Sequence, residues 1–128
     1  MKVYYAHCLE IYGKEQEKRD IATLKALGFE VINPSEPVHV EGYRREGMNY
    51  FTQLIENQAD ALAFRATASG LIPAGVAKEI EAARRKYVFK GNEPDQFGIP
   101  VFEIPTGILR RSLSVDETKE YLRDVGVR

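Results

Sequence analysis

Short apolar runs of β-branched and aromatic residues alternate along the chain with stretches in which apolar residues recur every three or four positions. Residues 2–8 (KVYYAHC) form the first run and predict a strand that is buried on both faces of a sheet. Residues 15–27 predict a helix that ends at Gly28, and residues 29–33 predict a second strand. This order predicts a right-handed βαβ unit at the start of the chain.

The next segment, residues 34–47, is broken by prolines and predicts a long loop at the edge of the sheet where ligands bind in open α/β folds. A loop of that length in a small domain suggests a flap. Met48, Phe51 and Ile55 then recur at helical spacing and predict a helix that ends near Gln58.

The alternation continues to the end of the chain. Residues 59–64 predict a third strand, and a helix with Glu79 follows it. Residues 88–100 begin as a short strand or a helix extension and continue as a loop, and residues 100–104 predict a further strand. An S-x-x-E capping box predicts a last helix over residues 115–124.

Alternating strands and helices of this kind predict one α/β domain over residues 1–128, a three-layer α/β/α sandwich around a Rossmann-like parallel sheet. The composition agrees, because 128 residues with 44% apolar and 29% charged side chains are typical of one globular domain. Eighteen Lys and Arg residues balance 19 Asp and Glu residues, so the charge indicates no binding to a nucleic acid polymer or to a membrane. A small-molecule ligand is the more natural partner.

The only cysteine, Cys8, excludes an intrachain disulfide, and one Cys with two His residues has no recognisable zinc spacing. No apolar run approaches the length of a membrane span, and the first residues are unlike a signal peptide. We therefore expect a cytoplasmic protein.

The most informative helix carries a carboxylate beside its apolar stripe. Val76, Ile80, Ala83 and Tyr87 recur at spacings of four, three and four, and Glu79 lies at the edge of that stripe. A carboxylate in the first turns of a helix stays ionised readily, because free backbone N–H groups and the helix dipole favour its charge. The carboxylate is therefore a candidate nucleophile, although helix propensity alone also explains a glutamate there.

Rossmann topology places the ends of the first and third strands close together, so residues of the first strand and residues that follow the second and third could converge on Glu79. These residues are Tyr4, Tyr5, His7 and Cys8 from the first strand, Asn33 after the second, and Arg65, Thr67, Ser69 and Gly75 after the third. A pocket with aromatic walls and one carboxylate would suit a nucleoside. Each residue also has a simpler explanation: Tyr4 and Tyr5 as core aromatics, His7 as an incidental polar residue, and Cys8 as a small buried filler.

Several common ligand-binding and catalytic motifs are missing. AHCLEIYG follows the first strand where a dinucleotide-binding protein would have G-x-G-x-x-G. A Walker A motif, a G-x-S-x-G elbow and H-E-x-x-H are missing as well.

The sequence resembles the nucleoside 2'-deoxyribosyltransferase superfamily, including its deoxynucleoside monophosphate N-glycosidase branch. The resemblance lies in KVYYA of the first strand, in the βαβ order, in Ala59 and Asp60, and in GVAKEIEAA at residues 75–83. It covers roughly residues 1–104.

The resemblance implies that Glu79 attacks the anomeric carbon of a deoxyribosyl group, forming a covalent glycosyl-enzyme that water or a second base resolves with retention. It implies that Tyr4 orients Glu79 or the sugar, and that Gly75 lets the backbone approach the ligand. Tyr5, His7, Asn33, Arg65 and Ser69 are the expected substrate-binding residues. No metal or organic cofactor is implied, and members are usually homo-oligomers.

The sequence also departs from the family. His7, Cys8 and Glu10 stand where the monophosphate-cleaving branch has a glycine, a serine and an arginine, and Pro73 replaces a serine. Thr52 stands where members have an acidic residue. A nucleotide-binding or sensing module without catalysis is therefore the second hypothesis, and a structural subunit with an occluded cleft is the third.

Overall fold

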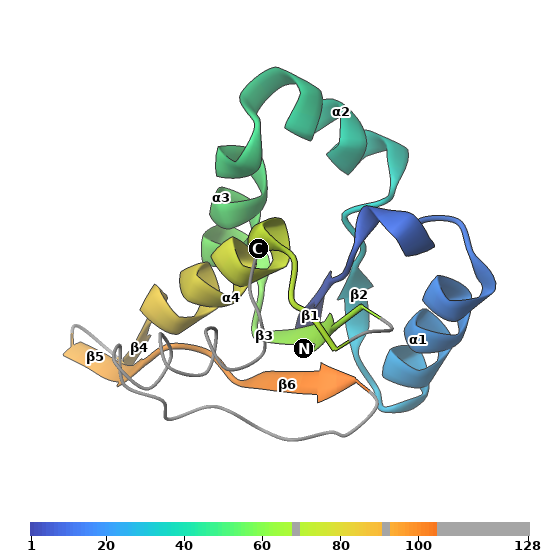
Figure 1. The fold of residues 1–128 in the computed structure, drawn as a ribbon. Helices are drawn as coiled ribbons and strands as arrows, with labels where there is room; N and C mark the ends of the chain where they lie inside the picture. Colours follow the sequence, from blue (N-terminus) through green and yellow to red (C-terminus); the bar gives the residue numbers. More distant parts are fainter. Residues whose placement is uncertain (68–69, 91–92, 105–128) are drawn as a thin grey trace.

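The computed structural model of the chain describes residues 1–67, 70–90 and 93–104 (Figure 1). For residues 87–90 and 93–97 it describes the backbone alone. Four parallel strands form its main sheet, in the order β2-β1-β3-β6. Their bounds are Lys2–Ala6 for β1, Glu30–Ile32 for β2, Ala61–Arg65 for β3 and Val101–Ile104 for β6. The predicted α/β fold with a Rossmann-like parallel sheet is confirmed.

Strands β1 and β3 are neighbours at the centre of the sheet, so their ends lie close together, as predicted for a ligand site there. Their register pairs Tyr4 with Leu62 and Tyr5 with Ala63. All strand residues from Val3 to Ala6 are buried, which agrees with the expectation of a strand covered on both faces.

The helices are α1 (Glu15–Ala26), α2 (Pro37–Glu46), α3 (Met48–Gln58) and α4 (Ala74–Arg85), and a short 3₁₀ turn, η1, covers Leu9–Ile11. The predictions for α1, α3 and α4 are confirmed. Gly28 follows α1 with a φ of 94°, a backbone conformation that glycine adopts readily, so it ends the helix as expected. None of the described helices combines the length and the apolar character needed to cross a membrane.

Two buried clusters lie against the sheet. Alternate residues of β1 enter different clusters, because successive side chains of a strand point to opposite faces. Tyr4 packs with residues of α3 and α4 such as Ile55 and Ile80. Tyr5 packs with Leu24 of α1. The layered arrangement of the whole chain stays a prediction, because residues 105–128, which include the predicted last helix, lie outside the described part.

The expected loop over residues 34–47 is wrong, because most of it is the helix α2. Pro37 occupies the first helical position, where its missing N–H has no intrahelical partner to lose and its fixed φ already suits a helix. The helix then turns into α3 at Gly47, which has a φ of 67°. Figure 1 shows α2 standing apart from the sheet, above the strand ends.

Two further expectations near residue 87 are also wrong. Tyr87 does not extend the apolar stripe of the α4 helix, because α4 ends at Arg85 and Tyr87 begins strand β4 (Tyr87–Lys90). This strand pairs antiparallel with β5 (Glu93–Phe97). The predicted short strand is therefore present, but the predicted loop after it contains a second strand.

Candidate active site

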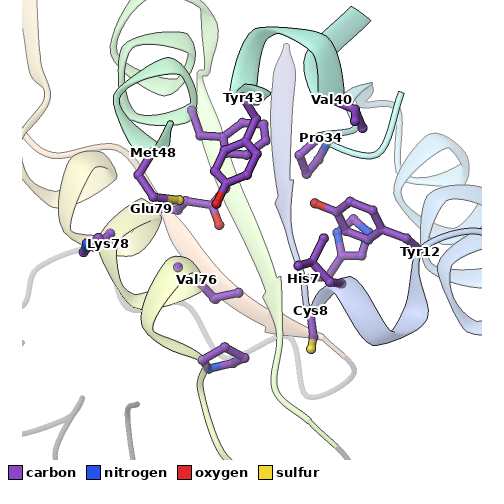
Figure 2. Close-up of a pocket in the computed structure, with 14 residues that line it drawn as sticks. His7, Cys8, Tyr12, Pro34, Val40, Tyr43, Met48, Val76, Lys78 and Glu79 are labelled. Carbon is purple, nitrogen blue, oxygen red and sulfur yellow. The ribbon is translucent and has the colours of Figure 1, made fainter. Parts of the chain in front are cut away.

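A cavity of about 340 Å³ lies between the end of β1, the α2 helix and the first turns of α3 and α4. Figure 2 shows Glu79 on one side of this cavity and Tyr12 on the other. Its volume is within the range of small-molecule sites. The lining residues are His7, Cys8, Leu9, Tyr12, Pro34, Val40, Tyr43, Met48, Phe51, Pro73, Gly75, Val76, Lys78 and Glu79.

Glu79 lines this cavity, and Tyr4, which does not line it, is its direct hydrogen-bond partner. The Tyr4 hydroxyl, from the centre of β1, donates a hydrogen bond to Oε2 of Glu79. Tyr4 is fully buried and Glu79 is only 5% exposed. Tyr4 is therefore both a core aromatic, as its sequence position also suggested, and the direct partner of the candidate nucleophile.

Burial raises the pKa of Glu79 to about 8, although the hydrogen bond from Tyr4 acts in the opposite direction. The expectation that this carboxylate ionises readily is therefore wrong. Helix α4 begins at Ala74, so Glu79 lies beyond the first turn, where the dipole effect has declined. Loss of hydration is then the larger effect, and the group is mostly protonated at neutral pH.

Tyr5 and Arg65 lie on the opposite face of the sheet, so neither lines the cavity. Asp20 of α1 accepts hydrogen bonds from the Tyr5 hydroxyl and from Nε and Nη2 of Arg65, the latter two at 2.6 and 2.8 Å. Burial would raise the pKa of Asp20, but these hydrogen bonds and a third from Gln16 outweigh it and lower the pKa. The two residues expected to bind substrate instead fix α1 to the sheet.

His7 lines the cavity and is part of a hydrogen-bonded network rather than an incidental polar residue. Its Nδ1 lies 2.9 Å from the backbone oxygen of Tyr5, and its Nε2 lies 2.7 Å from Oε2 of Glu17. Burial would raise the pKa of Glu17, but hydrogen bonds from His7 and from the Gly13 N–H lead the contributions that lower it. Both ring nitrogens thus have hydrogen-bond partners, which fix the orientation of the ring.

The remaining predicted residues differ in their placement. Gly75 lines the cavity beside Met48. Asn33 is buried and does not line it; its Oδ1 accepts a hydrogen bond from the Ser35 N–H, and the next residue, Pro34, forms part of the wall. Ser69 lies outside the described residues. Cys8 is half-buried and lines the cavity, so it is not an enclosed filler.

Sequence reasoning missed most of the aromatic wall. Tyr43 stacks on Phe51 with ring centroids 5.3 Å apart, and Tyr12 packs against His7 at 4.8 Å. Val40 and Tyr43 are three residues apart, a helical spacing that would have placed both on one face of α2. Tyr12 had no comparable signal, because it lies in a turn.

Among the described residues, no group of three or more His, Cys, Asp and Glu side chains is arranged to hold a metal ion. The polar groups of the cavity wall are instead two phenols, one imidazole, one thiol, one amine and one carboxyl group. Such a set suits an organic ligand with an aromatic part and a few polar atoms.

Comparison of the chain with protein-family models, with curated proteins and with solved structures gave no match. The case for a function therefore depends on the geometry of the cavity and on the sequence resemblance described above.

Proposed function

We propose that this protein is an N-glycosidase or nucleoside deoxyribosyltransferase-like enzyme that acts on a (deoxy)nucleoside or nucleotide through a covalent glycosyl-Glu79 intermediate. The observation that carries the proposal is that Glu79 lines a cavity of suitable size and is held there by a hydrogen bond from the buried Tyr4. The resemblance to the deoxyribosyltransferase superfamily in the first strand and around Glu79 supports the same assignment.

In the first step, a carboxylate oxygen of Glu79 forms a bond to the anomeric carbon of the sugar. The N-glycosidic bond breaks, and its electron pair leaves with the base. In the second step, water or the nitrogen of a second base attacks the same carbon, gives up its proton to the solvent and releases the Glu79 carboxylate. Two inversions give net retention. The Tyr4 hydroxyl holds Oε2 of Glu79, so the other oxygen, Oε1, is available for attack.

The reaction requires ionised Glu79, and burial raises the pKa of this group to about 8. Because kcat/KM follows the ionisation of essential groups in the free enzyme, its value should rise as the pH increases through about 8. The apolar wall formed by Tyr43, Met48 and Phe51 offers a surface against which an aromatic base can pack.

The test uses a 2-fluoro-arabinosyl nucleoside, because the fluorine slows breakdown of the glycosyl-enzyme. Intact mass spectrometry of the wild-type protein should show the added fluorosugar. Glu79→Ala should show no adduct, whereas Glu81→Ala, a change on the same helix outside the cavity lining, should still form it. A broad nucleoside and nucleotide panel that gives neither adduct nor free base would refute the enzymatic proposal.

A binding or sensing module without catalysis is the second candidate. It is favoured by the protonated state of Glu79 at neutral pH, since a neutral carboxyl group is a poor nucleophile. Thermal shift against a metabolite library separates the two functions. Saturable stabilisation without turnover over the whole range of pH from 6 to 9 would favour the binding module.

A further inference from the structure

The wall of the cavity opposite Glu79 contains a phenol that no role described above uses. Tyr12 lies just after the η1 turn and is half-buried. Figure 2 shows its hydroxyl on the side of the ring that faces Tyr43 and Glu79 across the cavity. None of the described residues gives this hydroxyl a hydrogen-bond partner. A polar group held in a largely apolar wall is expected to find its partner in water or in a ligand.

The position of Tyr12 is fixed through Glu17 of α1, which lies outside the cavity lining. Glu17 of α1 accepts a hydrogen bond from the backbone N–H of Gly13, the residue after Tyr12, at 3.2 Å through Oε1. Its other oxygen, Oε2, pairs with His7, against which the Tyr12 ring packs. One buried carboxylate therefore holds both the backbone beside Tyr12 and the ring beneath it. Glu17 is a positioning residue for this wall.

We propose that Tyr12 is the specificity-determining residue that donates a hydrogen bond to an acceptor nitrogen or oxygen of the heterocyclic base while Glu79 engages the sugar. This inference rests on the proposed function. The nucleoside would span the cavity, with the sugar on the α4 side and the base against the β1 and η1 side. The occupant class is therefore a nucleoside whose base carries a hydrogen-bond acceptor.

The Tyr12 hydroxyl stays protonated and can therefore act as a hydrogen-bond donor. Burial, together with the nearby carboxyl groups of Glu79 and Glu17, raises the pKa of Tyr12 well above its usual value, so the phenol stays neutral throughout the working range. As the glycosidic bond breaks, its electron pair moves onto the base. The hydrogen bond from Tyr12 then becomes stronger, because its acceptor on the base gains negative charge. The base leaves as an anion and takes its proton from solvent afterwards.

The test compares two purine deoxynucleosides, the neutral one that the wild-type protein cleaves fastest and its N7-methylated cation. The methylated base leaves as a neutral molecule and gains little from a donor. Tyr12→Phe should lower kcat/KM for the neutral nucleoside about 10- to 100-fold, the effect of a hydrogen bond to a charged group. For the methylated nucleoside the loss should be less than about 3-fold, because little charge develops on its base.

The control is Tyr50→Phe, which removes a phenol oxygen outside the cavity lining, where it contacts Nδ1 of His39. This variant should leave the ratio of the two rates unchanged. If Tyr12→Phe does not fold, Tyr12→Met, which fills the space with a flexible apolar chain, is measured in its place and should give the same change in ratio.

Three results are distinguishable. A ratio that changes only in the Tyr12 variants supports the inference. A wild-type protein that cleaves both nucleosides, with equal losses or no loss in Tyr12→Phe, overturns the role of Tyr12 and leaves the proposed function intact. A wild-type protein that cleaves neither nucleoside nor any other in the panel overturns the proposed function and the role of Tyr12 together.

Discussion

Two buried carboxyl groups, Glu79 and Asp20, lie on opposite sides of strand β1 and have pKa values that are shifted in opposite directions. Glu79 loses its hydration and receives one hydrogen bond, so its neutral form is favoured. Asp20 is also buried, but it receives hydrogen bonds from Tyr5, Arg65 and Gln16, so its ionised form is favoured. Burial alone therefore does not decide the charge of a carboxyl group; the number and the charge of its donors do.

Glu79 should make the folded state less stable as the pH rises. Its pKa is about 8 in the folded protein and near 4.5 when exposed, so the folded state holds the proton more tightly between these values. The contribution of Glu79 to the free energy of unfolding is fully present below pH 4.5. It is lost as the pH rises from there through 8, by about 1.4 kcal/mol per pH unit. Urea unfolding of wild type and Glu79→Gln at pH 5, 6.5 and 8 should show the variant gaining relative stability at each step. A constant difference would contradict the assignment.

Asp20 should have the opposite dependence on pH. Its folded pKa is lowered, so its stabilisation is present above the ordinary pKa of 3.8 and is lost as the pH falls through the folded value. Asp20→Asn leaves Arg65, which is 20% exposed at its side chain, without its anion. We expect a loss of about 2–3 kcal/mol at pH 7, below the range for fully buried pairs, and a smaller loss at pH 3.

The control for Asp20 is Glu15→Gln on the same helix. Glu15 lies 3.7 Å from Lys18, but both side chains are well exposed, so the pair should contribute little. Chemical unfolding at pH 7 and pH 3 measures both variants. Equal effects of the two substitutions would show that the Asp20 network is not a structural anchor.

At the scale of elements, α2 is held to α3 by a close contact at one glycine. Tyr50 of α3 occupies the space that a Cβ at Gly42 would need, and its hydroxyl contacts Nδ1 of His39 on α2 at 2.7 Å. Its ring also makes an edge contact with Phe51. These contacts fix the Tyr50 ring, so a larger residue at position 42 must displace the helix α2 instead.

Gly42→Ala should therefore destabilise the protein, although alanine is the better helix former. Overpacking of this kind costs about 1–3 kcal/mol. The loss should be accompanied by faster hydrogen exchange in α2, which carries Val40 and Tyr43 of the cavity wall. Glu46→Ala, at the exposed end of the same helix, is the control and should change neither quantity. A higher melting temperature in Gly42→Ala would show that α2 is not packed in this way.

At the scale of the whole molecule, the resemblance to deoxyribosyltransferases predicts a homo-oligomer, and the cytoplasmic location likewise stays a prediction. Large apolar side chains are exposed at the cavity rim and on the adjacent helix: Leu9 is 75%, Val38 63% and Tyr43 43% exposed. Light scattering coupled to size exclusion at micromolar concentrations should give a dimer or a larger assembly. A monomer under these conditions would contradict the expectation.

The order of strands and helices was predictable because the apolar spacing changes clearly from run to run, as in residues 2–27. The sequence predicts a loop in place of the α2 helix, because prolines inside a segment usually break a helix, whereas Pro37 occupies the first helical position, where proline is favoured. Arg65 lies on the face of the sheet opposite the predicted one. Its alternation with Ala63, which packs beside Tyr5, could have placed it near α1.

The candidate site was predictable only in part. Tyr4, Glu79 and Gly75 could be connected through topology and resemblance, because they belong to regular elements whose ends meet. Tyr12 lies in a turn, and its place beside His7 depends on the hydrogen bonds that Glu17 makes. Such contacts arise from tertiary packing, which the spacing of residues along the chain does not encode.

Strand β1 places neighbouring tyrosines on opposite sides, with Tyr4 against the proposed nucleophile and Tyr5 against the anchor of α1. A slip of this strand by one residue would move one phenol into the place of the other and bring Val3 or Ala6 to the second place, so one of the two acids would lose its phenol donor. An insertion or deletion within these few positions should therefore disrupt either the proposed site or the contact that fixes α1. Evolution can adjust the chemistry of this site only through substitutions that keep the length of that segment.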